Sequence, residues 1–378
     1  MNLIDYSNCI VNVSNSILNY YGIKTFNKTL SELDQILFKT KPKNIILFLC
    51  DGLGMETLKS TLPIDSFLIR NLKAEITSVF PTTTVAATTS IMTGLYPNQH
   101  CWLGWDNYIS KMDKVVTMFL NKEKETGINL PSELSCEKIF PYTTIMNIIS
   151  KEKNISTKFF SPYSGERYNG LSDLCNKLEN ECNSNNQNFI YAYYENPDSI
   201  MHQTGLESNE TIENINFINE QLELLSKKLE DTMLIVTADH GLIESNYLYL
   251  EDYKELFECL KHTTSIDSRA PMFFVKDEKK KIFENLFDKY FKNDFILYNK
   301  TEILNKKLFG INNNHNLFES CIGDYIAVSI GNRAIKYKRK GSEHIASHSG
   351  LTIDECKVPL ILCFIDKEEV LIKWIAKK

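Results

Sequence analysis

Short, continuous hydrophobic runs alternate along the chain with longer segments of helical periodicity. The clearest runs cover residues 45–50, 189–194, 233–237 and 358–363. Runs of this length without polar positions are typical of strands that are covered on both faces, as in parallel sheets. Between residues 212 and 229, isoleucine and leucine recur at steps of three and four, which predicts an amphipathic crossover helix. The pattern therefore predicts an α/β fold with a mostly parallel central sheet and helices on both faces.

Weaker strand patterns occur at residues 76–80, 156–160, 272–275 and 325–330. Between residues 251 and 332 the chain becomes more polar and richer in lysine, with Asn312-Asn313-Asn314 as a surface turn. We therefore expect one α/β domain over residues 1–378, with a cap or insertion at 251–332.

Composition narrows the class of protein. The 378 residues contain 42 Lys+Arg and 48 Asp+Glu, for a net charge of -6, which argues against a general binder of nucleic-acid polymers. No apolar stretch is long enough for a membrane span, and the first residues lack the pattern of a secretory signal, so we expect a cytoplasmic protein. The 10 cysteines are scattered without any C-x-x-C pair, which favours free buried thiols over disulfides.

Polar residues follow the hydrophobic runs at the sheet edge where open parallel sheets bind ligands. Asp51-Gly52-Leu53-Gly54 comes directly after the first run, although a turn that caps the next helix is the alternative interpretation. After Phe80-Pro81, the series Thr82-Thr83-Thr84 places a hydroxyl at the start of a helix. A helix N-terminus offers free N–H groups and partial positive charge, which suit a phosphoryl oxygen. Taken alone, the three threonines also fit an ordinary N-cap.

Two further segments combine aspartate with histidine. Asp198 and His202 are four positions apart, so a helix beginning at Pro197 puts both on one face, where they can bind the same ion. A capping Asp with an unrelated His fits this spacing equally well. Asp239-His240 follows the 233–237 run, and its side chains converge only if the strand ends there and the backbone curls. The late segment His344-Ile345-Ala346-Ser347-His348 supplies one more imidazole.

In this order, the segments resemble the alkaline phosphatase superfamily and, within it, the type I phosphodiesterase/nucleotide pyrophosphatase family. The closer likeness lies in Phe80-Pro81-Thr82-Thr83-Thr84 with Thr93-Gly94-Leu95-Tyr96-Pro97 thirteen residues on. The resemblance spans about residues 44–245 and returns at 344–363. It implies an alkaline-phosphatase-like fold and a metal-dependent phosphoric ester hydrolase with two divalent metal ions, Zn²⁺ being the first candidate.

The resemblance also implies roles for individual residues. Asp51, Asp239 and His240 would hold one ion, and Asp198, His202 and His348 would hold the other. Thr84 aligns with the family's nucleophile and would bridge the first ion to the substrate. Family members usually carry Phe-Pro-Asn-His after the nucleophile, whereas this chain has Val85-Ala86-Ala87-Thr88. Ala87 therefore replaces the asparagine amide that helps to bind a phosphate oxygen.

The predicted substrate is a small phosphate ester, with nucleotides among the candidates. A monoester needs extra cation near its second negative charge. No arginine lies within the four motifs, and Arg167 and Arg269 are the nearest, so a diester is favoured. Thr88, a backbone N–H or Asn107 could replace the missing asparagine amide. Trp102, Trp105 and Tyr193 or Tyr194, of which we choose Tyr194, could stack on a base, with core packing as the alternative. Two other functions stay open, namely a phosphomonoesterase or other phosphoryl-transfer member of the superfamily and a non-catalytic metal-binding relative.

Overall fold

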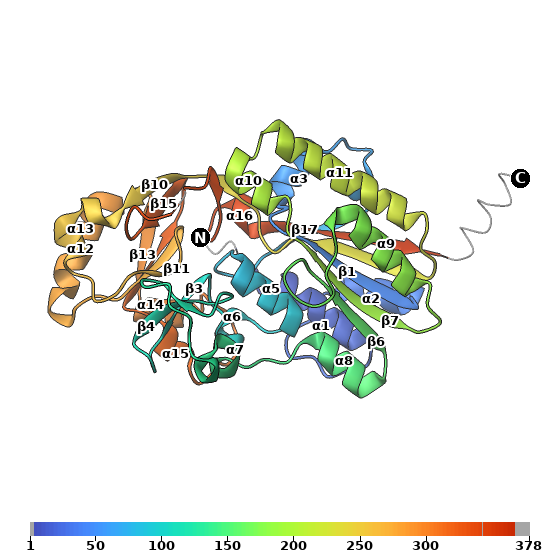
Figure 1. Ribbon diagram of the computed structural model, residues 1–378, viewed down its shortest axis with the longest axis horizontal. Helices are drawn as coiled ribbons and strands as arrows, with labels where there is room; N and C mark the ends of the chain where they lie inside the picture. Colours follow the sequence, from blue (N-terminus) through green and yellow to red (C-terminus); the bar gives the residue numbers. More distant parts are fainter. Residues whose placement is uncertain (1–3, 342, 367–378) are drawn as a thin grey trace, which may run out of the picture.

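A six-stranded sheet forms the centre of the computed structural model, which describes residues 4–341 and 343–366 (Figure 1). The strand order is β2-β17-β8-β1-β7-β6. β1 is parallel to β7 and β8, and β6 is parallel to β7, whereas β17 is antiparallel to both of its neighbours. The strands are β1 Asn44–Cys50, β2 Leu72–Thr77, β6 Ser156–Phe160, β7 Asn188–Tyr194, β8 Thr232–Thr237 and β17 Lys357–Ile365.

The four hydrophobic runs confirm the prediction of doubly covered strands. Every residue of β1 and β8 is buried, and β1 lies between β7 and β8, with Ile45 opposite both Phe189 and Met233. The run predicted at 76–80 is shifted, because β2 ends at Thr77 and the following residues lead into a helix instead.

Helices cover both faces of the sheet, as predicted (Figure 1). On one side α1, α5 and α8 pack together, and on the other α11 packs against α3, α4 and α9. The predicted crossover helix is α11, whose buried positions include Ile215, Ile218 and Leu222. The helices of these layers are α1 Ile10–Tyr20, α2 Ser31–Thr40, α3 Met55–Thr61, α4 Phe67–Arg70, α5 Thr84–Thr93, α8 Ile145–Lys153, α9 Gly170–Cys182, α10 Asp198–Thr204 and α11 Asn209–Ser226.

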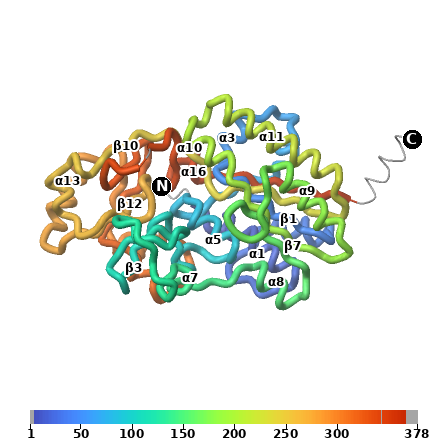
Figure 2. Tube along the Cα trace, in the orientation of Figure 1, coloured from blue at the N-terminus to red at the C-terminus, as the bar shows by residue number. Residues whose placement is uncertain are grey.

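A second sheet combines two distant parts of the chain, in the order β13-β14-β12-β11-β3-β4-β5. Figure 2 shows the segment near residue 110 lying beside the segments near residues 270 and 300. The weak runs at 272–275 and 325–330 correspond to β12 and β14 of this sheet. Whether 251–332 forms a cap stays a prediction. The strands are β3 Asp106–Ile109, β4 Lys114–Thr117, β5 Lys122–Glu123, β11 Ser265–Asp267, β12 Ala270–Phe273, β13 Phe295–Asn299 and β14 Tyr325–Ser329.

Shorter elements complete the described chain. Two two-stranded sheets pair β10 with β15 and β9 with β16. Their strands are β9 Ile243–Glu244, β10 Asn246–Tyr249, β15 Arg333–Lys336 and β16 Ala346–Ser347. The remaining α-helices are α6 Pro97–His100, α7 Cys136–Ile139, α12 Lys254–Phe257, α13 Lys280–Phe291, α14 Lys300–Asn305, α15 Phe318–Cys321 and α16 Ile353–Cys356.

A buried ion pair joins the second sheet to the segment before β17. Arg269 Nε and Nη2 donate to Glu355 Oε1 and Oε2 at 2.6 and 2.8 Å, and both side chains are fully buried. The same carboxylate accepts hydrogen bonds from Gly350 N and from Thr352 N and Oγ1. Since bidentate pairs with satisfied lone pairs fix both partners, this contact holds the 348–355 segment in place.

The cysteine and membrane predictions can also be compared with the structure. All 10 cysteines lie in the described part of the chain, and no disulfide joins them there; each is buried except Cys363, which is half-buried, in agreement with the prediction of buried thiols. Among the described residues, every helix is too short or too polar to cross a membrane. A cytoplasmic location stays a prediction.

Candidate active site

The candidate site lies at the carboxyl ends of β1, β7 and β8, which stand next to each other in the sheet. Asp51 follows β1, and its N–H donates to Tyr194 O at the end of β7 at 2.9 Å. Asp198 N donates to Asp51 O at 3.0 Å, and Gly52 N donates to Asp239 Oδ1 at 3.1 Å. These backbone contacts bring three aspartates from distant parts of the chain to one place.

Glycine is required where these segments approach most closely. Gly52 has a φ of +75°, a conformation that side chains with a Cβ rarely adopt. A Cβ at this position would lie 2.7 Å from Leu242 Cδ1 and 2.8 Å from Asp198 Cβ. The Asp-Gly pair therefore does more than turn the chain, because it lets the loop after β1 contact the loops after β7 and β8.

One group of side chains surrounds Thr84, the first residue of α5. Thr84 Oγ1 lies 3.2 Å from His240 Nε2. The same nitrogen lies 3.4 Å from Asp239 Oδ2 and 3.6 Å from Asp51 Oδ1. Ligand atoms of Asp51, Asp239 and His240 all lie within 4.8 Å of one another, so the three side chains can contact one ion. The backbone after β8 therefore curls as the prediction for Asp239-His240 requires.

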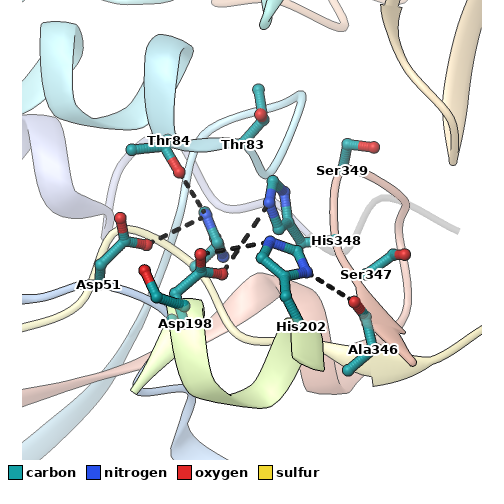
Figure 3. A network of polar contacts seen from close by, with 12 residues as sticks. Asp51, Thr83, Thr84, Asp198, His202, Ala346, Ser347, His348 and Ser349 are labelled. Atoms are coloured by element: carbon teal, nitrogen blue, oxygen red, sulfur yellow. Dashed lines mark hydrogen bonds and ion pairs between the residues drawn. The ribbon is translucent and has the colours of Figure 1, made fainter. Parts of the chain in front are cut away.

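A second group forms around Asp198 at the start of α10 (Figure 3). His202 Nε2 lies 3.2 Å from Asp198 Oδ2, and His348 Nε2 lies 4.0 Å from Asp198 Oδ1. The His348 ring also stacks on the His240 ring at 3.9 Å. Ligand atoms of Asp198, His240 and His348 all lie within 4.8 Å of one another, and this set does not include His202. His240 thus stands between the two groups. The structure brings together all seven of the predicted residues, including His202 beside Asp198.

The histidines are held by backbone carbonyls on the side away from the carboxylates. His202 Nδ1 contacts Ala346 O at 2.7 Å, His348 Nδ1 contacts Thr82 O at 3.1 Å, and His240 Nδ1 contacts Gly241 O at 3.2 Å. When Nδ1 donates to a carbonyl, Nε2 presents its lone pair to the site, which is the form that ligates a metal ion.

Three buried carboxylate oxygens provide a test of whether this donor set fits metal ions. Asp51 Oδ1, Asp198 Oδ1 and Asp239 Oδ2 have no hydrogen-bond partner among the described residues. Buried polar atoms are nearly always partnered, so such oxygens need an explanation. Carboxylate and imidazole ligands of this kind suit Zn²⁺ and other divalent transition ions. The residues therefore fit a pair of divalent cations.

The pKa shifts of the three aspartates also indicate that the site binds positive charge. Burial raises the pKa of Asp51 well above its ordinary value, and repulsion from Asp239 and Asp198 raises it further. Burial also raises the pKa of Asp239, against the attraction of His240. Burial alone would raise the pKa of Asp198, but the attraction of His202 outweighs it and lowers that pKa. Without cations, two of the three carboxylates resist ionisation.

We expect a chelator to lower the melting temperature, and to lower it more at about pH 8 than at about pH 6. In the folded chain without metal, the pKa values of Asp51 and Asp239 are raised. The pKa of His202 is also raised, because the attraction of Asp198 outweighs the effect of burial. The folded chain therefore binds extra protons, which metal ions must displace. Metal binding therefore strengthens as pH rises. Saturating ions should add about 3–4 kcal/mol, or roughly 5 °C or more, in calorimetry. An unchanged melting temperature after verified metal removal at both pH values would contradict the metal prediction.

A cavity of about 1110 Å³ opens over the two groups, and some but not all of the predicted substrate contacts line it. Thr88, Trp102 and Trp105 line it. Asn107 does not, because its buried amide donates to Cys101 O and accepts from Leu103 N, so the prediction for Asn107 needs correction. Tyr194 is also absent from the lining, and Tyr193 takes its place, because neighbouring strand residues point to opposite faces. The Tyr193 hydroxyl donates to Asp51 Oδ2.

Other residues at the cavity carry no sequence signal of their own. Asp267, at the end of β11, accepts a hydrogen bond from Thr83 Oγ1 at 2.7 Å, and burial raises the pKa of this carboxyl to about 6. His344 packs against His202 with ring centroids 4.2 Å apart. Four lysines also line the cavity, namely Lys124, Lys336, Lys338 and Lys340. His344 stands in the predicted histidine segment. The other residues are brought to the cavity by contacts between segments that are distant in the sequence.

Comparison with known proteins agrees with this geometry. The family model described as type I phosphodiesterase / nucleotide pyrophosphatase matches residues 45–349, and the chain belongs to that family of phosphoric ester hydrolases. Human ectonucleotide pyrophosphatase/phosphodiesterase family member 1 is 27% identical over 248 residues, covering 57% of this chain. The match covers only 25% of that human protein's length.

Solved structures of murine and human relatives share the fold. Murine ectonucleotide pyrophosphatase / phosphodiesterase 5 gives a TM-score of 0.65 at 18% identity, covering 84% of this chain and 87% of that chain. The human counterpart gives 0.64 at 17% identity, with the same two coverages. An inactive threonine-to-alanine form of the murine protein, solved in complex with AMP, gives a TM-score of 0.64 at 18% identity, again covering 84% and 87% of the two chains. The alkaline-phosphatase-like α/β fold predicted from the sequence is confirmed.

Proposed function

We propose that this protein hydrolyses phosphodiester or diphosphate bonds in small, nucleotide-like molecules, with Thr84 as the nucleophile and two divalent metal ions, zinc first among them. One observation carries the proposal: three buried carboxylate oxygens, which have no hydrogen-bond partner among the described residues, lie around His240, and His240 Nε2 lies 3.2 Å from the Thr84 hydroxyl. Family membership supports the reaction class. The AMP complex of the murine threonine variant supports both a nucleotide substrate and a threonine at the centre of the reaction.

The two groups of side chains would hold the two ions. Asp51, Asp239 and His240 would hold one, and Asp198, His202 and His348 the other. When bound, the ions supply positive charge that offsets the negative phosphate and lowers the pKa of a nearby hydroxyl. Two divalent ions would balance the three carboxylates and an ionised Thr84, so that a monoanionic diester meets a site near neutrality.

The chain's own groups then account for positioning and covalent chemistry. Thr84 is the first residue of α5, so its oxygen stands at a helix N-terminus, where free N–H groups and the helix dipole favour a phosphoryl group. After the Thr84 hydroxyl loses its proton to solvent, its oxygen attacks phosphorus. A phosphothreonine that still carries the retained part of the substrate forms, the bond to the leaving alcohol or phosphate breaks, and the leaving oxygen takes up a proton from water. Water then cleaves the phosphothreonine and restores the hydroxyl. Ala87 supplies no amide, so the free backbone N–H groups in the first turn of α5 would donate to a phosphate oxygen in its place.

The arginines support a diester over a monoester. Arg269 is fully buried against Glu355, and Arg167 is exposed, with its guanidinium on Tyr163 O at 3.4 Å. Neither lines the cavity in the described part of the chain. The second negative charge of a monoester therefore lacks an arginine partner at the site.

A paired ester assay tests the proposal. We expect the protein to hydrolyse bis-p-nitrophenyl phosphate at least about tenfold faster than p-nitrophenyl phosphate in kcat/KM, because one unpaired charge costs about 1.4 kcal/mol or more. Elemental analysis of the same preparation should give two divalent ions per chain, and activity should return when zinc is added back after chelation. A preference for the monoester would favour a phosphomonoesterase, and metal-loaded protein without turnover on either ester would favour a non-catalytic relative.

A further inference from the structure

Thr82, which precedes Thr84 by two residues, contacts the segment that carries His348 at three points. The carbonyl oxygen of Thr82 lies 3.1 Å from His348 Nδ1. The hydroxyl of Thr82 accepts a hydrogen bond from Ser349 N at 3.1 Å and donates one to Gly350 O at 3.0 Å. A hydroxyl can do both at once, because it carries one proton and two lone pairs. One side chain therefore fixes the backbone that directly follows His348.

These contacts lie where water cannot replace them. Thr82 and Ser349 are both fully buried, and Gly350 is buried beside them. A buried N–H or C=O that loses its partner pays the full cost of leaving water, so the backbone moves to find another partner. The Thr82 hydroxyl is the partner of two such groups, and its removal would leave both of them unpaired.

The backbone that the hydroxyl holds is in an unfavourable conformation. Ser349 has a φ of +96°, which residues with a Cβ rarely adopt. Such a conformation persists only where the surroundings hold it on several sides. The two hydrogen bonds of the Thr82 hydroxyl lie on both sides of the Ser349 side chain, at its own N–H and at the next carbonyl. Figure 3 shows the result, with Ser349 directed away from Asp198 and His348 directed toward it.

The same contacts connect the two groups of candidate ligands. Thr84 stands beside the first group, with Oγ1 3.2 Å from His240 Nε2, and only one residue separates it from Thr82. His348 belongs to the second group, with Nε2 4.0 Å from Asp198 Oδ1. The hydroxyl of Thr82 therefore sets the distance between the segment of the candidate nucleophile and the segment of a candidate ligand.

We propose that Thr82 is a positioning residue whose hydroxyl holds His348 in place for the second metal ion. Thr82 is not among the residues that line the cavity in the described chain, so it acts through His348 and not on the substrate. This inference rests on the proposed function, because the second ion is part of that function. It predicts that removal of the hydroxyl weakens the binding of one ion and spares the other.

Metal titration of the full chain tests this role. Thr82→Val keeps the shape of the side chain and removes the hydroxyl. Metal-free protein is titrated with Zn²⁺ in competition with a chelator of known affinity, which gives two dissociation constants. One of them should rise at least about tenfold, as is common when a group that orients a ligand is lost, and the other should stay within about threefold. The constant that rises should be the one that His348→Ala removes. Thr82→Ser keeps the hydroxyl and should stay within about threefold in both.

Thr77 offers a matched control for the loss of a buried hydroxyl. It is fully buried at the end of β2, and its hydroxyl accepts from Asp5 N at 3.1 Å and donates to Asp5 O at 3.2 Å. Thr77→Val therefore removes the same two kinds of hydrogen bond as Thr82→Val and should lower the melting temperature similarly. Both ions should nevertheless bind within about threefold of wild type. This control separates positioning of His348 from general loss of stability.

Hydrogen exchange tests the contact without any metal. In metal-free Thr82→Val, the peptide covering residues 347–351 should exchange at least about tenfold faster than in wild type, because Ser349 N has lost its acceptor. Thr77→Val should leave that peptide unchanged. If Thr82→Val folds poorly, Thr82→Cys serves in its place, since a thiol is a weak donor and a weak acceptor and should give smaller changes in the same direction.

The outcomes distinguish this inference from the proposed function. If wild type binds two ions and Thr82→Val binds both equally well, or if Thr77→Val weakens one ion as much, Thr82 is not a positioning residue, and the proposed function is unaffected. If wild type binds fewer than two ions, the proposed two-ion function fails, and the part of this inference that concerns the second ion fails with it. Exchange at residues 347–351 then decides whether Thr82 holds the segment of His348.

Discussion

Replacing Thr84 by alanine should reduce kcat for bis-p-nitrophenyl phosphate by at least about three orders of magnitude, because a covalent route without its nucleophile retains only binding and electrostatic contributions. Thr84 Oγ1 contacts His240 Nε2 at 3.2 Å, and Thr84 is partly exposed to the cavity. Its loss leaves the carboxylates and imidazoles in place. Metal content by elemental analysis should therefore stay near the wild-type value.

Two controls separate chemistry from folding in this experiment. Thr84→Ser keeps the hydroxyl and should retain measurable turnover. Thr93→Ala removes the same atoms from the other end of α5, where the hydroxyl donates to Thr89 O at 2.7 Å, and should leave kcat within about threefold of wild type. If Thr84→Ala keeps more than about a tenth of wild-type kcat, another group is the nucleophile.

Replacing Arg269 by methionine should lower the free energy of unfolding by about 3–5 kcal/mol near neutral pH, because Glu355 is left as an uncompensated buried charge. Burial alone would raise the pKa of Glu355, but Arg269 outweighs burial and lowers it below its ordinary 4.5. In wild type, this stabilisation is fully present above about pH 4.5 and is lost as pH falls through the lowered value. In the variant, protonation relieves the buried charge, so the difference between the two proteins should narrow in acid.

Urea titrations of matched variants measure this effect. Arg70→Met removes one partner of a surface ion pair, with Glu223 at 3.3 Å, and should cost about 1 kcal/mol or less. Arg269→Met/Glu355→Gln should recover part of the loss, since the charge is removed with its partner. If Arg269→Met lowers the free energy of unfolding by only about as much as Arg70→Met does, the buried ion pair contributes little to stability.

The sequence predicted the central sheet and the candidate ligands because both depend on local patterns. β1 and β8 are fully buried strands, and their hydrophobic runs show this directly. Asp51 and Asp239 follow these strands, so their meeting at one sheet edge needs only the parallel arrangement. His202 follows Asp198 at helical spacing, and α10 begins at Asp198. Their roles in metal binding stay predictions until the experiments above are done.

The features that were missed depend on contacts between distant segments. Asn107 looks available in the sequence, but both the nitrogen and the oxygen of its buried amide are hydrogen-bonded to the backbone of the preceding loop. Choosing between Tyr193 and Tyr194 requires the exact orientation of β7 at its last two residues. Lys336, Lys338 and Lys340 have the composition of an ordinary solvated surface, and only the folded chain shows that they line the cavity. The second sheet likewise needs pairing between Asp106 and Ile266.

The place of β17 has a consequence for fragments of this protein. β17 lies between β2 and β8, although β2 is formed near residue 75 and β17 near residue 360. A fragment that stops before Lys357 would leave two strand edges unpaired in the middle of the sheet, where they invite pairing with another chain. C-terminal truncations that remove β17 should therefore aggregate instead of folding into a smaller soluble protein. A separate peptide with the β17 sequence should restore their solubility.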